Sequence, residues 1–403
     1  MTEAEVKDGT KKVDDKLGCI DYRKYTFARM IMIDDGLAAR GLTFPLLLIM
    51  VVNVGMQTCS FISIFTSTQT SVSLDNIRAC LLGTSVTMSL FNQFISRQAI
   101  ARLHGFFDKS FRTISTNPNF PEEKIILDDA RKAASSQLEM YVKMFSCNAV
   151  AMMFAQPLGE LMSGHSWRKL PVQWTFPPSD DEFSFWLIFA FQFTGICIAH
   201  CVGIMIMSFT SITIQMTALF DLLIFSIQHI EERATARGRQ SGGDRHACLL
   251  ACLTDDVDFY QQLIREMDSV TPHLRNTFLI ISAAVPMVLA CEAYPIMQGN
   301  FSFADLVKSF LFLSIQILCW AQTCSRLGTM TDKHAAVFAA LYDSPWYEAG
   351  MKYKKLVLNS LTYAVQPKYI KARLSNEVTA SMATFYSFVM SAFNLLNMIR
   401  NIG

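Results

Sequence analysis

The segment "FSFWLIFAFQFTGICIAHCVGIMIMSFTSITIQMTALF" (residues 183–220) contains no charged side chain. Its apolar pattern continues past Asp221 as far as Ile230. A helix needs about 20 residues to cross the roughly 30 Å of hydrocarbon in a bilayer. A helix of about 45 residues is roughly 70 Å long. We therefore predict a helix that crosses a membrane and leaves it while still apolar.

The composition agrees with this interpretation. Hydrophobic residues make up 51% of the 403 residues and charged residues 17%, with a mean hydropathy of +0.28. These values are too apolar for a soluble chain of this length. The strongly charged residues 1–40 lack the apolar core of a signal peptide. A net charge of +1 gives no reason to expect a nucleic-acid partner.

The sequence predicts an all-α polytopic membrane protein with seven transmembrane helices. The expected spans are residues 42–65, 72–95, 138–158, 183–209, 274–297, 302–324 and 376–399. Of the 35 Lys and Arg residues, 28 lie before the first span or in the segments after the second, fourth and sixth spans. Three lie in the opposite loops and the C-terminal tail. Positive charge concentrates on the cytoplasmic side, so we expect a cytoplasmic N-terminus and an extracellular C-terminus. Asn300, in an Asn-Phe-Ser sequon, then lies outside as a glycosylation candidate.

We expect four regions along the chain. Residues 1–41 form a cytoplasmic segment, 42–324 hold six spans with the ligand pocket, 325–375 form cytoplasmic anchor helices, and 376–403 hold the seventh span. The extended fourth helix needs a cover outside the membrane, and residues 325–363 are the expected partner. We predict a cytoplasmic helical domain that joins subunits. The alternative is a broken fourth helix with a re-entrant turn.

A polar stripe runs along the last span. Its members recur at steps of four and three: Thr384, Ser387, Ser391, Asn394 and Met398. Phe and Leu side chains occupy the rest of this helix. The stripe either faces water along a pore or packs against another helix through its small residues.

Catalytic and metal-binding patterns are missing from the sequence. The seven His residues show no metal-ligand spacing, and neither a Gly-rich phosphate loop nor a Gly-x-Ser-x-Gly turn occurs. We predict no catalytic site, no metal and no cofactor, and therefore no enzyme. A transporter would show inverted repeats or broken helices. A G-protein-coupled receptor would have an outside N-terminus, an Asp-Arg-Tyr sequence after the third span and an Asn-Pro-x-x-Tyr sequence in the seventh.

The C-terminal residues carry a resemblance to a known family. "ALYDSPWYE" (340–348), followed by "FYSFVMSAFNLLNMIRN" (385–401), resembles the end of an insect odorant receptor. Related chemoreceptors have Thr-Tyr, five hydrophobic residues and Gln-Phe in the last span. Here the matching positions read Ser387-Phe388, residues 389–393 and Asn394-Leu395. Phe for Tyr, Asn for Gln and the interruption by Ser391 are departures from that pattern.

The resemblance implies an odorant-tuning subunit in the plasma membrane of olfactory sensory neurons. Such subunits form a heterotetramer with a co-receptor, and the four last spans line one non-selective cation channel. No G protein is required. A homotetrameric, gustatory-type ligand-gated channel is the alternative within this group of chemoreceptors.

The resemblance also places a pocket for a small volatile odorant in the outer half of the membrane, among the second to sixth spans. By depth, the candidates are Arg78, Leu81, Met152, Phe154, Phe189, Gln192, Phe193, Ile196, Met287, Tyr294 and Phe312. Arg78 is expected either to pair with Glu292 or to extend to the lipid headgroups. A donor among Arg78, Gln192 and Tyr294 would favour a ligand with an acceptor, such as an ester, ketone or aldehyde.

Overall fold

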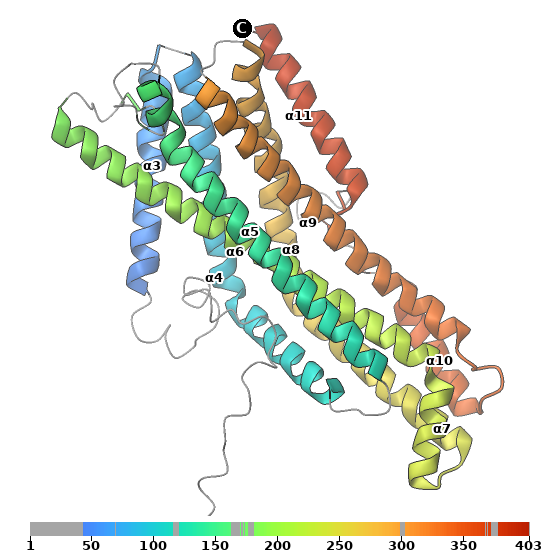
Figure 1. Ribbon diagram of the computed structural model, residues 1–403. Helices are drawn as coiled ribbons and strands as arrows, with labels where there is room; N and C mark the ends of the chain where they lie inside the picture. The colour runs from blue at the N-terminus through green and yellow to red at the C-terminus, as the bar shows by residue number, and fades with distance from the viewer. Residues whose placement is uncertain are drawn as a thin grey trace, which may run out of the picture.

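The computed structural model describes residues 43–68, 70–115, 121–162, 170, 172, 174–175, 181–298, 303–366, 368, 370–371 and 378–402. These residues form long helices (Figure 1) and one isolated antiparallel bridge between Lys371 and Thr379. The helices are α3 (Thr43–Thr66), α4 (Thr70–Ser115), α5 (Pro121–Met162), α6 (Glu182–Gln228), α7 (Ile230–Ser241), α8 (Arg245–Gln298), α9 (Phe303–Asp343), α10 (Met351–Ala364) and α11 (Met382–Ile402). The all-α fold class is confirmed. Asn300 and residues 1–41 lie outside the described residues.

Helix α6 is continuous over 47 residues, so the alternative of a broken fourth helix is wrong. Its start is capped by Asp181, whose carboxylate accepts a hydrogen bond of 2.9 Å from the backbone N–H of Ser184. Residues 182–228 contain no proline, and the glycines at 195 and 203 do not interrupt the helix.

The C-terminal half of α6 is covered by α5, α8 and α9, and α10 packs in turn on α8 and α9. Phe220, Leu223 and Ile227 are buried in one cluster with side chains from residues 325–363. That segment contributes Val337, Leu341, Tyr353 and Val357 as buried members and Phe338, Trp346, Leu356 and Leu361 as partly buried ones. The predicted partner of the extended helix is therefore confirmed.

Each predicted span overlaps one of the helices α3, α4, α5, α6, α8, α9 and α11. Within the described residues, three helical stretches are long and apolar enough to cross a membrane by composition alone: 182–228, 245–294 and 306–343. A shorter apolar stretch covers 50–66. Helices α4, α5 and α11 fall short of this criterion, so the count of seven crossings and their orientation stay predictions.

Helix α7 is held against α8 by a buried ion pair. Arg233 donates to both carboxylate oxygens of Asp256 at 2.8 Å, and Ser226 Oγ donates to Asp256 Oδ1 at 2.6 Å. Burial raises the pKa of Asp256 above its ordinary value, because the loss of solvation outweighs the attraction of Arg233. Gly242 ends α7 with φ of 66°, a conformation that favours glycine.

A short hairpin leads from α10 into α11 and is attached to α8. Ala380 N donates to Ile370 O at 2.9 Å within the hairpin, and Arg275 Nε on α8 donates to Lys371 O at 3.1 Å. Lys368 forms an ion pair with Asp268 of α8 at 2.5 Å. These contacts therefore fix the start of α11 relative to α8.

His334 lies where this hairpin meets the anchor helices. Its ring stacks on Phe220 of α6, with centroids 5.2 Å apart, and its Nε2 lies 2.9 Å from Tyr260 Oη of α8. Lys368 N donates to its Nδ1 at 3.2 Å. Burial, together with the positive charge of Lys368, lowers the pKa of His334 from 6.5 to about 4.

This environment predicts an acid-sensitive anchor domain. His334 stays neutral in the folded chain, whereas the unfolded chain binds a proton below pH 6.5. The stabilisation is complete above pH 6.5 and is lost as the pH falls toward 4, at about 1.4 kcal/mol per unit. By pH 5 the free energy of unfolding should fall by about 2 kcal/mol through this residue alone.

Unfolding of the detergent-solubilised protein at pH 7.5 and pH 5 measures this loss. His334→Gln keeps polar atoms at the site but does not titrate, so its loss should be smaller by about 2 kcal/mol. An equal loss in the wild type and the variant would contradict the assignment.

Candidate functional site

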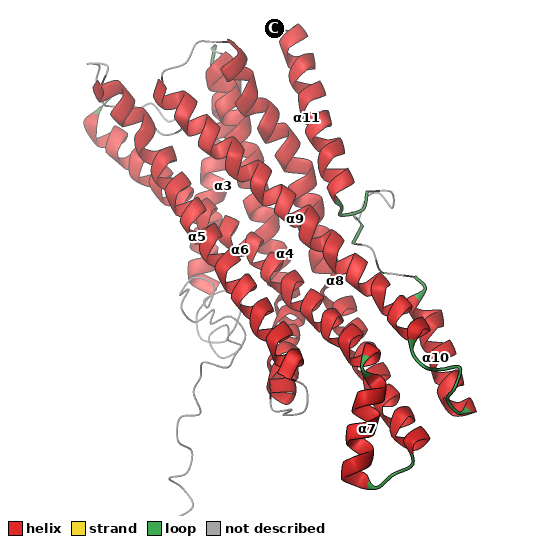
Figure 2. Cartoon of the chain, turned by 45° about the vertical axis from the view of Figure 1, so that its right-hand side comes forward, coloured by secondary structure: helices red, strands yellow, loops and turns green. Residues whose placement is uncertain are grey.

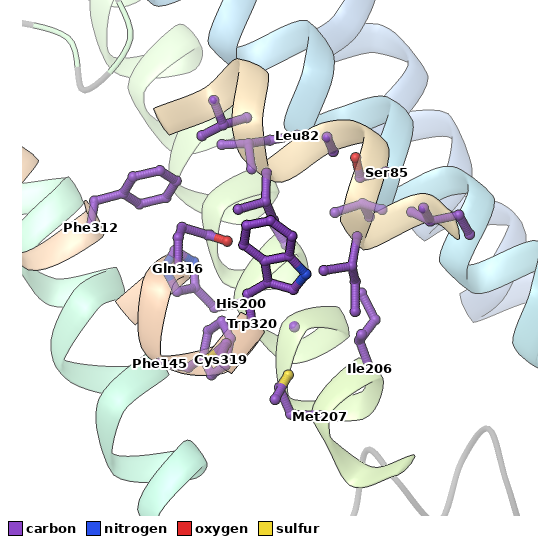
Figure 3. A pocket seen from close by; sticks show the side chains of 18 of the residues that line it. Leu82, Ser85, Phe145, His200, Ile206, Met207, Phe312, Gln316, Cys319 and Trp320 are labelled. Carbon is purple, nitrogen blue, oxygen red and sulfur yellow. The ribbon is translucent and has the colours of Figure 1, made fainter. Parts of the chain in front are cut away.

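A cavity of about 140 Å³ lies between α4, α5, α6, α8 and α9 (Figure 3). Its lining is mostly apolar. The lining residues are Leu82, Ser85, Val86, Phe145, Asn148, Ala199, His200, Gly203, Ile206, Met207, Ile280, Ile281, Ala284, Val285, Val288, Phe312, Gln316, Cys319, Trp320 and Thr323. A concave apolar site with a few polar groups is the usual form of a small-molecule site.

Both hydroxyl side chains of the lining are already hydrogen-bonded to their own helices. Ser85 Oγ donates to Leu81 O, and Thr323 Oγ1 donates to Cys319 O, both at 2.8 Å. Such bonds satisfy the hydroxyl donor within the helix. These two side chains therefore present acceptor lone pairs to the cavity.

A polar pair in the lining joins α5 to α6, and Gln316 of α9 is a further polar side chain of the lining. His200 Nδ1 lies 2.7 Å from Ile196 O, and Asn148 Nδ2 lies 2.9 Å from His200 Nε2. Because a carbonyl only accepts, His200 Nδ1 carries a hydrogen and donates. Asn148 is 2% exposed, so this pair lies inside the helix bundle.

Gly203 allows Phe145 to lie against α6. A Cβ at position 203 would lie 2.5 Å from Phe145 Cε1, closer than non-bonded carbon atoms approach. Both residues line the cavity. The shape of the cavity wall therefore depends on the missing side chain at this position.

Phe312 is the sequence-predicted pocket residue that lines the cavity. Leu81, Met152 and Ile196 pack with Phe312 in an adjoining apolar cluster. On α5 and α6 this cluster lies nearer the predicted outer membrane surface than Phe145 and His200 do. The structure therefore brings four of the predicted residues together, but it places the cavity one to two turns deeper.

The other predicted pocket residues lie away from the cavity. Phe154, Phe193 and Met287 are exposed side chains, and Phe189 stacks on Phe185. Tyr294 is half-buried and does not belong to the cavity lining. Their contact with a ligand stays a prediction.

Gln192 and Arg78 have protein partners. Gln192 is fully buried; its Oε1 accepts from Val172 N at 3.0 Å and its Nε2 donates to Val172 O at 2.8 Å. Arg78 forms a buried ion pair with Glu292 and lies 3.2 Å from Asp75. The expected pairing with Glu292 is confirmed, and the surface alternative is wrong. Neither side chain belongs to the cavity lining, and the expected ester, ketone or aldehyde stays a prediction.

Trp320 connects the cavity to α11. Its ring lies in the middle of the lining side chains in Figure 3 and is completely buried. The ring centroids of Phe385 and Phe388 on α11 lie 5.2 and 5.3 Å from that of Trp320. A ligand beside Trp320 is thus separated from α11 by one aromatic layer.

Helix α11 stands at the edge of the bundle (Figure 2) and packs against α8 and α9 through one face. Phe385, Phe388, Ala392 and Leu396 form that face. The opposite side leaves Ser387, Ser391, Asn394 and Met398 exposed. Thr384 is half-buried instead, and its Oγ1 donates to Thr379 O at 2.5 Å, at the start of the helix.

The match to a family model establishes the identity of the chain. The model of the seven-transmembrane odorant receptor matches residues 70–393, most of the sequence. This chain belongs to the odorant receptor family. Odorant receptors of this family are ligand-gated ion channels in membranes and not enzymes. The receptor sequence matches no curated protein at a significant level.

Two solved structures of an insect olfactory receptor share the fold of this odorant receptor. OR5 from Machilis hrabei matches with a TM-score of 0.74 and 13% identity, covering 94% of this chain and 98% of that chain. The same receptor in complex with eugenol matches with a TM-score of 0.70 and 12% identity, covering 92% of both chains. At this identity the likeness shows the fold alone.

The contact between Gly203 and Phe145 predicts a size-selective variant of the receptor. Gly203→Ala forces the Phe145 ring to move and changes the space for a ligand. For the largest active member of a homologous odorant series, the half-maximal concentration should rise about tenfold, and for the smallest it should rise less. Current recordings over the series measure this difference.

Gly105→Ala is the matched control, because a Cβ at position 105 meets nothing within 4 Å. This variant should keep the wild-type order of potency. A uniform rise across the whole series in Gly203→Ala would contradict a steric role for the cavity.

Proposed function

We propose that this receptor binds a small volatile apolar ligand in the cavity beside Trp320 and thereby gates a non-selective cation channel. The proposal rests on one observation above all. Trp320 lines the cavity and packs against Phe385 and Phe388, on the face of α11 opposite the exposed polar stripe. A change at the cavity therefore reaches α11 through direct contact.

Ser387, Ser391, Asn394 and Met398 are the proposed pore-lining residues, with Thr384 at the base of the stripe. Their exposure fits a surface that faces a water-filled axis when several copies of α11 meet. The stripe carries no acidic residue, so hydroxyl and amide dipoles would contact the ions. Weak selection among cations is the expected consequence.

Exposed apolar side chains support assembly with other subunits. On α11, Tyr386, Met390 and Phe393 are exposed beside the stripe, and on α10, Met351 and Leu358 are exposed. Lipid or neighbouring subunits would cover such surfaces. We propose that co-receptor subunits supply these contacts in a heterotetramer, in the plasma membrane of olfactory sensory neurons and without a G protein.

Ligand binding would favour the open channel only if the open state binds the ligand more tightly. Movement of Trp320 would change its packing on α11 and alter the position of the stripe. Known coupling energies between sites are about 1–3 kcal/mol, or about 5- to 150-fold in affinity.

Whole-cell current recording tests the proposal. Cells would express the chain alone or with an insect co-receptor, under volatile odorants and with G-protein signalling blocked. Rapid cation currents only with the co-receptor would support the heteromeric channel. Currents from the chain alone would favour the homotetrameric alternative, and no current from receptor at the cell surface would contradict the proposal.

Substitution of Ser391 tests the pore assignment. Ser391→Leu places a bulky apolar side chain on the stripe, and hydrophobic constrictions obstruct water and ions. Single-channel conductance should fall by about half or more, with little change in ligand potency. Met382→Leu, on the same helix but off the stripe, should retain the wild-type conductance. Equal conductance in both variants would exclude Ser391 from the conduction path.

Substitution of Trp320 tests the coupling. Trp320→Leu should lower the maximal ligand-gated current about tenfold at equal surface expression, because the aromatic contact to α11 is lost. Trp186→Leu is the matched control: Trp186 is 45% exposed and lies outside the cavity. A normal maximal current in Trp320→Leu would require another route from ligand to channel.

A further inference from the structure

The cavity contains a buried hydrogen-bond acceptor without a partner. Asn148 is 2% exposed, and its Oδ1 accepts no hydrogen bond. Buried polar atoms in native proteins nearly always have a partner, so each exception requires an explanation. Asn148 belongs to the cavity lining, where a ligand can supply the missing donor.

The orientation of the Asn148 amide is fixed by its neighbour. His200 Nδ1 donates to Ile196 O at 2.7 Å. The described lining residues include no carboxylate to balance an imidazolium, so the ring is neutral and its Nε2 can only accept. Asn148 Nδ2 must therefore be the atom that faces His200 Nε2, at 2.9 Å. This leaves Oδ1 as an acceptor without a partner, on a side chain that belongs to the cavity lining.

The same cavity contains a donor without a partner. Trp320 is completely buried, and its indole Nε1–H donates to no acceptor. Buried Trp N–H groups usually find a partner. A ligand that satisfies both side chains must offer a donor and an acceptor, and a neutral hydroxyl group offers both. A volatile amine would also donate, but its charged form is costly to bury in this apolar lining.

We infer that the ligand of this cavity carries a hydroxyl group whose O–H donates to Asn148 Oδ1. Its size follows from the cavity volume of about 140 Å³. An apolar cavity of about 150 Å³ holds benzene, so a small monocyclic phenol or a short-chain alcohol fits. This inference rests on the proposed function only in treating the cavity as the odorant site. Esters, ketones and ethers lack the donor and leave Oδ1 unpaired.

Binding to the purified full-length receptor in detergent micelles tests the inference. Phenol, its isostere toluene and the acceptor-only anisole would be compared by the concentration dependence of thermal stabilisation. Phenol should bind about tenfold more tightly than toluene or anisole, because only phenol satisfies the Asn148 acceptor. Equal affinities would show that water already satisfies this acceptor, and they would overturn the inference. A lack of binding by all three would overturn it as well.

Variants assign the preference to one atom. Asn148→Leu removes the acceptor at similar volume and should bring phenol to the affinity of toluene. Thr194→Val is the control, because Thr194 Oγ1 donates to Ala190 O and the side chain lies outside the cavity lining; it should keep the tenfold preference. A preference for phenol that survives Asn148→Leu would overturn the assignment. If Asn148→Leu does not fold, the comparison of the three ligands on the wild-type receptor still decides the inference.

Currents recorded with the same ligands separate the two proposals. Selective binding of phenol without any ligand-gated current, alone or with a co-receptor, would contradict the proposed function and leave the hydroxyl site standing. A second outcome is that toluene and phenol evoke currents at the same concentrations and that Asn148→Leu does not change these currents. This outcome would support the channel and overturn the hydroxyl site.

Discussion

The burial of one uninterrupted apolar helix is the constraint on which the rest of the structure depends. Helix α6 is too long for a bilayer, and its C-terminal half needs a cover of protein. Helix α5, the N-terminal half of α8 and the C-terminal half of α9 supply that cover, and α10 packs on α8 and α9 in the same apolar cluster. Helices α5, α8 and α9 also line the cavity. The proposed ligand site and the anchor helices are therefore built on the same long helices.

Polar contacts then connect this scaffold to the helix at its edge. His334 contacts α6 and α8 and accepts from the backbone of the segment that leads to α11. Arg275 attaches the same segment to α8. At the other end, Trp320 packs on α11 directly. The segment before α11 and the first two turns of α11 therefore depend on separate contacts, one polar and one aromatic.

The sequence predicted the elements well because their signals are local. An apolar run without a breaker produces a helix, and the need to cover it identified residues 325–363. The pairing of Arg78 with Glu292 could also be predicted from the sequence, since a cation within a span needs a partner. The depth of the cavity could not be predicted from the sequence. It depends on where the helices diverge and on close contacts such as that of Gly203 with Phe145. Gln192 illustrates this point: its partner is the backbone of Val172, in the outer loop. A polar residue in the middle of a predicted span would have indicated the position of the cavity, and Asn148 and His200 are such residues.

Trp320 has a consequence for how such a receptor changes over generations. One side chain serves both the floor of the cavity and the packing of α11. Under the proposed function, a substitution of Trp320 would alter ligand choice and channel opening together, and selection would act on both properties at once. Helix α11 packs mainly on α8 and α9, and less on α4 and α5. Substitutions in the lining from α4 and α5 would therefore change odour preference with less effect on α11.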